Sequence, residues 1–115
     1  HDQRKNEKEQ KSAKKEVDLN GTWQNQVNNM MYKIHHSGDL VTFQEIEILY
    51  GIETVTAAGA GKIIEDKLIV EYETIYTTKG KAELKIANNS NSLFGSSKDL
   101  VTDDQTILKL IKLGS

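Results

Sequence analysis

Apolar and polar residues alternate along most of the chain after residue 16, with the period of two that is typical of half-buried β-strands. Beta-branched and aromatic residues form short runs, and Gly, Asn, Asp and Ser fall between the runs. No segment of this region has the longer period of an amphipathic helix. The pattern predicts eight or nine strands, at residues 22–26, 30–36, 40–49, 52–58, 61–64, 67–77, 81–87, 92–97 and 106–113.

One predicted strand changes phase, in the stretch "DLVTFQEIEILY". Val41 and Phe43 share one face, whereas Ile46 and Ile48 share the other, so both pairs reach the core only if the strand bends or bulges near residues 44–45. Such bends let a small sheet curl and close on itself. Together with the short connections, this predicts an all-β fold, an antiparallel up-and-down β-barrel of about eight strands over residues 17–115.

The first 16 residues have a different composition from the rest of the chain. They hold one apolar residue, Ala13, with six of the 15 basic and four of the 17 acidic residues, which leaves nine basic and 13 acidic residues for the barrel. A segment this polar cannot bury a core, so we expect a flexible charged tail over residues 1–16. The tail is either a solvated linker or a membrane tether that begins at a lipid-modified cysteine upstream of His1.

The stretch "LNGTWQNQ" contains Gly21-Thr22-Trp23, which resembles the Gly-x-Trp opening of the lipocalin-like (calycin) barrels. In that family the tryptophan plugs the closed end of the barrel, and a basic residue near the end of the last strand packs over it. Lys109 or Lys112 would take that place here, where the family more often has arginine. The hairpin order and the strand number fit the same family, and the closest likeness in style is to small bacterial lipocalin-like lipoproteins. The resemblance implies a location outside the cytoplasm, secreted or lipid-anchored at the bacterial cell envelope.

The stretch "IVEYETIYTTKGKAELKI" raises a question about the barrel interior. One face of its first strand carries Val70, Tyr72, Thr74 and Tyr76, so its less charged side is lined by phenols and hydroxyls. Tyrosine is common in three environments, so three interpretations stay open. The side chains fill the core, they form an exposed face of the sheet, or they line a ligand pocket. On the pocket interpretation, the candidate ligand-binding residues are Trp23, Tyr72, Thr74 and Tyr76.

Several kinds of chemistry find no support in the sequence. The chain has no cysteine, which excludes thiolate catalysis and disulfides within it. The mildly acidic barrel region lacks the basic stripe on which nucleic-acid binding depends. The run "AAGAGK" lacks the Lys-Ser/Thr ending of a phosphate-binding loop. We therefore predict a protein that is not an enzyme, uses no cofactor and binds no nucleic acid.

Two constellations of titratable residues also favour a structural interpretation. His35 and His36 are adjacent in a predicted strand and point to opposite faces, so they cannot chelate one ion together, and no metal site is predicted. The carboxylates of Glu45 and Glu47 share a face about 7 Å apart. They are interpreted as part of a solvent face rather than as a catalytic pair.

The sequence thus predicts a non-catalytic binding protein outside the cytoplasm. One expected partner is a small apolar ligand held inside the barrel. The alternative is a protein-binding module, such as an enzyme inhibitor that presents barrel loops. Its candidate contacts lie in the turns "HHSGD" and "ANNSNS", at His36, Ser37, Asp39, Asn89 and Asn91.

Overall fold

The computed structural model describes residues 17–114, so the predicted flexible tail at 1–16 lies outside the described residues. No helix in the described region has the length and apolar character needed to cross a membrane. Eight strands account for most of this region: β1 (Gly21–Asn25), β2 (Met31–Ser37), β3 (Leu40–Leu49), β4 (Ile52–Ile64), β5 (Lys67–Thr74), β6 (Lys79–Ile86), β7 (Ser92–Asp99) and β8 (Gln105–Gly114).

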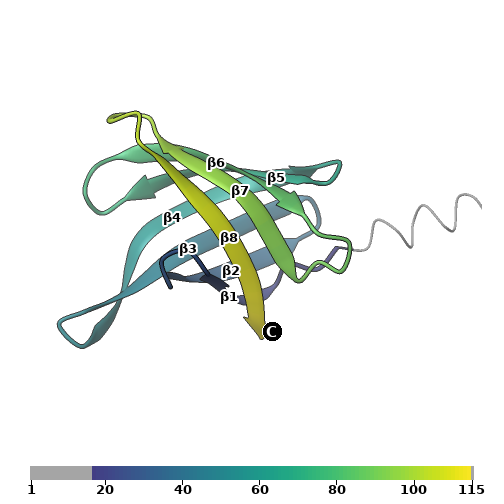
Figure 1. Ribbon diagram of the computed structural model, residues 1–115, viewed down its shortest axis with the longest axis horizontal. Coiled ribbons are helices and arrows are strands. Elements are labelled where there is room, and N and C mark those ends of the chain that lie inside the picture. Colours follow the sequence, from purple (N-terminus) through teal and green to yellow (C-terminus); the bar gives the residue numbers. More distant parts are fainter. Residues whose placement is uncertain (1–16, 115) are drawn as a thin grey trace, which may run out of the picture.

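The eight strands form one closed antiparallel barrel in which each strand pairs with its neighbours in sequence and β8 pairs back with β1 (Figure 1). The predicted all-β barrel is therefore confirmed. Closure leaves no sheet edge unpaired among the described strands, which removes the usual risk of edge-to-edge association.

The predicted break between residues 58 and 61 is absent, because β4 runs without interruption through its small residues. A Cβ atom built on Gly59 would lie 2.3 Å from the Glu71 carbonyl oxygen, and one on Gly61 would lie 2.0 Å from that of Ile69. The small residues thus allow close approach of the β5 backbone rather than a turn. The strand predicted at residues 67–77 is too long, because β5 ends at Thr74 and residues 75–78 form the connection to β6.

The predicted irregularity appears as a register shift between Glu45 and Ile46, but the extra residue lies in β4 and not in β3 as predicted. Glu45 pairs with Ala57 and Ile46 pairs with Val55, so Thr56 of β4 is the extra residue of a β-bulge. Ile46 is buried but belongs to neither the core cluster nor the cavity lining, and Ile48 is 64% exposed.

Trp23 closes one end of the barrel. Its side chain is completely buried, and its indole N–H donates a hydrogen bond of 2.9 Å to the Leu19 carbonyl. Of the two lysines expected to cover it, Lys112 does so, with its Nζ atom 5.7 Å from the ring centroid. The same Nζ atom donates to the Asp18 carbonyl at 2.9 Å, which holds the cation over the ring.

The opposite end of the barrel, which we call the mouth, carries the β1–β2, β3–β4, β5–β6 and β7–β8 connections. The β3–β4 hairpin reaches far out from the barrel at the lower left of Figure 1. Each of the four mouth connections and their flanks expose large apolar side chains, which are Val27, Ile48, Tyr50, Ile52, Ile75, Tyr76, Leu100 and Val101. The mouth is thus surrounded by apolar groups in contact with solvent.

Candidate ligand cavity

A cavity of about 410 Å³ occupies the barrel interior and opens at the mouth. This volume falls within the range of roughly 300–1,000 Å³ that is usual for small-molecule sites. Its deeper wall is apolar and includes Ile34, Phe43, Leu68, Val70, Leu84 and Leu110. The interior is therefore hollow enough to hold a small molecule.

In β5 and β7 the inward-facing residues change from apolar to polar toward the mouth. In β5 the inward series is Leu68, Val70, Tyr72 and Thr74, with the two aliphatic residues buried and the two polar residues partly exposed. In β7 the corresponding series is Leu93, Gly95, Ser97 and Asp99. The phenols and hydroxyls that the sequence presented on one face of β5 are thus the upper wall of an amphipathic cavity.

Glu45 is the charged residue that projects into the cavity from the middle of a strand. Its Oε2 atom accepts a hydrogen bond of 2.9 Å from the Tyr32 hydroxyl, and its Oε1 atom accepts one of 3.0 Å from the hydroxyl of Thr56, the bulge residue. Burial of the phenol, together with the charge of Glu45, raises the pKa of Tyr32 above its ordinary value. The phenol therefore stays protonated and serves as a donor to the carboxylate.

Three aromatic rings line the cavity next to Glu45. The ring of Phe43 lies 6.1 Å from those of both Tyr32 and Tyr72, with a tilted geometry to the first and an edge-to-face geometry to the second. Tyr72 also covers Gly80, where an added Cβ atom would lie 2.2 Å from the Tyr72 ring. The absence of a side chain at Gly80 thus makes room for this ring against the wall.

The predicted ligand-binding residues are separated in the structure. Tyr72 and Thr74 line the cavity. Tyr76 lies in the β5–β6 connection and is 63% exposed, so it belongs to the rim of the mouth. Trp23 is buried beneath the closed end and is not among the lining residues. The cavity therefore brings together two of the four residues.

The predicted protein-binding residues all lie at the closed end. His36, Ser37 and Asp39 flank or form the β2–β3 connection, and Asn89 and Asn91 belong to the β6–β7 connection. The His36 ring contacts both the segment before β1 and the β2–β3 connection. Its Nδ1 atom accepts a hydrogen bond of 3.3 Å from the Leu19 N–H, and its Nε2 atom lies 2.9 Å from the Gly38 carbonyl oxygen. The chain thus gathers these residues at the opposite end from the cavity mouth.

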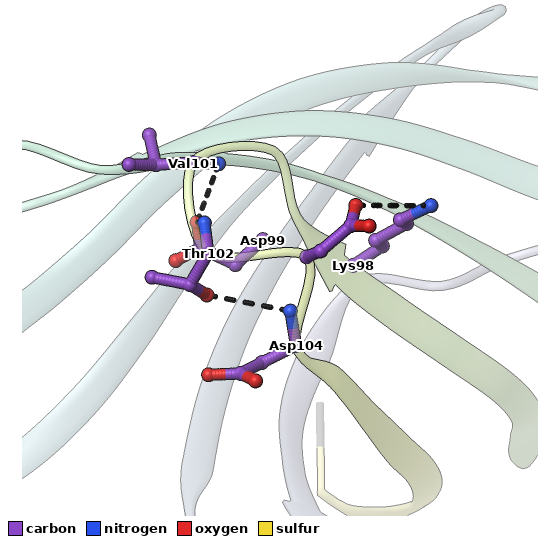
Figure 2. A network of polar contacts seen from close by, with 6 residues as sticks. Lys98, Asp99, Val101, Thr102 and Asp104 are labelled. Carbon is purple, nitrogen blue, oxygen red and sulfur yellow. Dashed lines mark hydrogen bonds and ion pairs between the residues drawn. The ribbon is translucent and has the colours of Figure 1, made fainter.

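The β7–β8 connection forms one side of the mouth and is ordered by its own polar groups (Figure 2). One carboxylate oxygen of Asp99 accepts from the Val101 and Thr102 backbone N–H groups, at 2.8 and 3.0 Å. The Thr102 hydroxyl accepts from the Asp104 N–H at 3.3 Å. Lys98 pairs with Asp103 at 3.2 Å. These contacts hold Leu100 and Val101 out at the rim.

We predict that this connection loosens in acid because of Asp99. Hydrogen bonds from the Thr102 and Val101 backbone amides lower the pKa of this carboxyl below its ordinary value of 3.8. A lowered pKa in the folded state means that the stabilising contribution is present above the ordinary value and is lost as the pH falls through the folded value. The amide proton shifts of Val101 and Thr102 in NMR spectra should therefore titrate with a midpoint below 3.8.

The variant Asp99→Asn is the control, because its amide cannot ionise and the two shifts should then stay constant through the same pH range. A midpoint at or above the ordinary value in the original protein would contradict the assignment.

Residues 17–114 contain no group of three or more histidine or acidic side chains placed to hold a metal ion. Glu45 and its neighbours instead offer hydrogen-bond acceptors and hydroxyl groups in an apolar cavity. This arrangement can recognise the polar end of a small molecule whose remainder is apolar.

No family model, curated protein or solved structure matches the chain.

The charged lining residues Glu45, Asp99 and Asp104 were not recognised from the sequence as site residues. For Glu45 the alternation did carry this information, because Glu45 falls on the same face of the strand as Val41 and Phe43 and precedes the change of phase. The interpretation as a solvent face assigned it to the wrong side of the strand. Asp99 is the last residue of β7, beyond the end of the strand predicted at 92–97. Asp104 lies in the β7–β8 connection, whose geometry cannot be predicted from the alternation of residues.

Proposed function

We propose that this protein is a lipocalin-like carrier or sensor that binds a small, mostly apolar molecule in the barrel cavity. The observation that carries the proposal is the hollow interior of about 410 Å³, apolar at its base and open at the mouth. A purely structural barrel of this size would be filled by side chains. The exposed apolar side chains around the mouth support the proposal, because an apolar ligand would meet them on entry.

The test is to fill the cavity. Ala82 lines it from β6 and is 3% exposed, so Ala82→Phe would place a ring in the ligand space. We expect the neutral fluorescent probe 2-methoxynaphthalene to bind the original protein and to lose at least about tenfold in affinity, which is about 1.4 kcal/mol, in the variant. Fluorescence titration measures both affinities, and thermal melting shows whether the variant is folded.

Ala60→Phe is the matched control, because Ala60 lies on β4 with its side chain exposed on the outer wall. It adds the same ring outside the cavity and should leave probe binding unchanged. Equal binding by Ala82→Phe and the original protein would overturn the proposal, as would the lack of any binding with a dissociation constant below about 1 mM.

A second candidate function is protein binding, favoured by the exposed apolar rim that Tyr50 and Leu100 typify. An interface usually includes such exposed apolar and aromatic side chains. A rim variant, Tyr50→Ser with Leu100→Ser, would then abolish binding of the partner and leave binding of the probe intact. The location outside the cytoplasm and the lipid tether stay predictions, which a lipobox cysteine upstream of His1 would support.

A further inference from the structure

The charged side chains that line the cavity are all acidic. They are Glu45, Asp99 and Asp104, and the lining residues include no lysine, arginine or histidine. All three lie toward the mouth, above the aliphatic base. A ligand that enters the cavity therefore meets negative charge at its outer end and apolar surface at its inner end.

The lysines nearest the mouth lie outside the cavity and do not neutralise these three carboxylates. Lys79 pairs with Glu73 at 3.8 Å, and Lys98 pairs with Asp103 at 3.2 Å. All four of these side chains are at least 46% exposed, on the outer wall or the loop tip. The cations near the mouth are thus engaged outside the cavity.

Glu45 is the deepest of the three carboxylates, and its observed partners are neutral. The hydroxyls of Tyr32 and Thr56 each occupy one of its oxygens. An ionised carboxylate accepts about four hydrogen bonds, so acceptor capacity is left for a donor in the cavity. A charged group next to apolar surface is also stabilised strongly by an opposite charge, because the local dielectric constant is low.

We propose that the ligand is an amphipathic amine, with its alkyl or ring portion against the aliphatic base and its ammonium group at Glu45. This inference rests on the proposed function. An ammonium group supplies both the missing countercharge and the hydrogen-bond donors that Glu45 can accept. A neutral alcohol supplies a donor without the charge, and a fatty acid would bring a like charge to three carboxylates.

The volume of the cavity limits the ligand size. Taking about 30 Å³ for each group the size of a water molecule, the cavity has room for roughly a dozen non-hydrogen atoms. Decylamine, decanol and decanoate are therefore suitable probes, because they share one chain and differ in the charge of the head group.

Isothermal titration calorimetry at neutral pH would compare the three probes on the full chain. We expect decylamine to bind roughly tenfold more tightly than decanol, and decanoate to bind most weakly. The variant Glu45→Gln should reduce decylamine affinity about tenfold and leave decanol affinity within about twofold. Glutamine keeps the size of the side chain and an oxygen that can accept from Tyr32 or Thr56.

The control Glu71→Gln makes the same chemical change on an exposed position of β5 and should alter none of the three affinities. Decanol or decanoate binding as tightly as decylamine to the original protein would overturn the amine assignment and leave the cavity function standing. The same conclusion follows if Glu45→Gln folds and keeps the preference for the amine. Failure of all three probes to bind would instead overturn the proposed function, and the assignment with it. The comparison of head groups on the original protein is decisive even if the variant does not fold.

Discussion

Replacing Trp23 by alanine is expected to lower the free energy of unfolding by about 3–5 kcal/mol, the usual cost of deleting a buried large aromatic side chain. The indole is completely buried and contacts the core from the closed end. Single domains are stable by only about 5–15 kcal/mol in total, so this loss is a large fraction of the stability. Urea denaturation followed by circular dichroism would measure it.

Two comparison variants separate the causes of this loss. Trp23→Phe keeps an aromatic ring but leaves the Leu19 carbonyl without its indole donor, so we expect a smaller loss of about 1–3 kcal/mol. Phe94→Ala deletes an aromatic side chain that is 58% exposed on β7 and should change stability by less than about 1 kcal/mol. A loss for Trp23→Ala no greater than that for Phe94→Ala would mean that the closed end is not held by the indole.

Replacing Gly95 by alanine is expected to cost at least about 3 kcal/mol, at the upper end of the range for overpacking. A Cβ atom at this position would lie 1.8 Å from the Glu83 carbonyl oxygen and 2.8 Å from the Leu84 Cα atom. Both are backbone atoms of β6, so no side-chain rotation relieves the contact. The β6–β7 pairing would have to separate, and both strands would lose hydrogen bonds of the closed sheet.

Gly114→Ala provides the control, because an added Cβ atom there meets nothing within 4 Å. Urea denaturation of both variants should show a large loss for Gly95→Ala and a change of less than about 0.5 kcal/mol for Gly114→Ala. Equal stabilities of the two variants would show that β6 and β7 can move apart without cost, which would contradict the close approach at Gly95.

The fold could be predicted from the sequence because its signals are local and repeated. Alternation, turn residues and short connections recur along the whole barrel region, and each is independent evidence for antiparallel hairpins. Trp23 could be recognised because it is the only tryptophan and follows a glycine at the start of a strand. Gly21 has a φ of 144°, a conformation that other residues rarely adopt, which explains the glycine before Trp23.

The site was predicted less well, and the reason is visible in three residues. Tyr72 and Thr74 were grouped with Tyr76 because the alternation puts all three on one face of the predicted strand. The strand ends at Thr74, however, and Tyr76 is exposed in the connection that follows. Glu45 was assigned to solvent because carboxylates usually face water. In the barrel its charge is accommodated by Tyr32 and Thr56, which belong to two other strands.

The sequence by itself determined the antiparallel strand pattern and the positions of most turns, because these depend on neighbours along the chain. The place of Trp23 at the closed end followed from the resemblance to lipocalin-like barrels. Tertiary structure alone decided that the interior is hollow and that its charged lining is acidic. Alternation sorts the residues of a strand into two faces. When both faces carry apolar and polar residues, it does not show which face points into the barrel. That choice depends on the bulge at Thr56 and on contacts between strands distant in sequence, which fix both the cavity volume and the inward direction of Glu45.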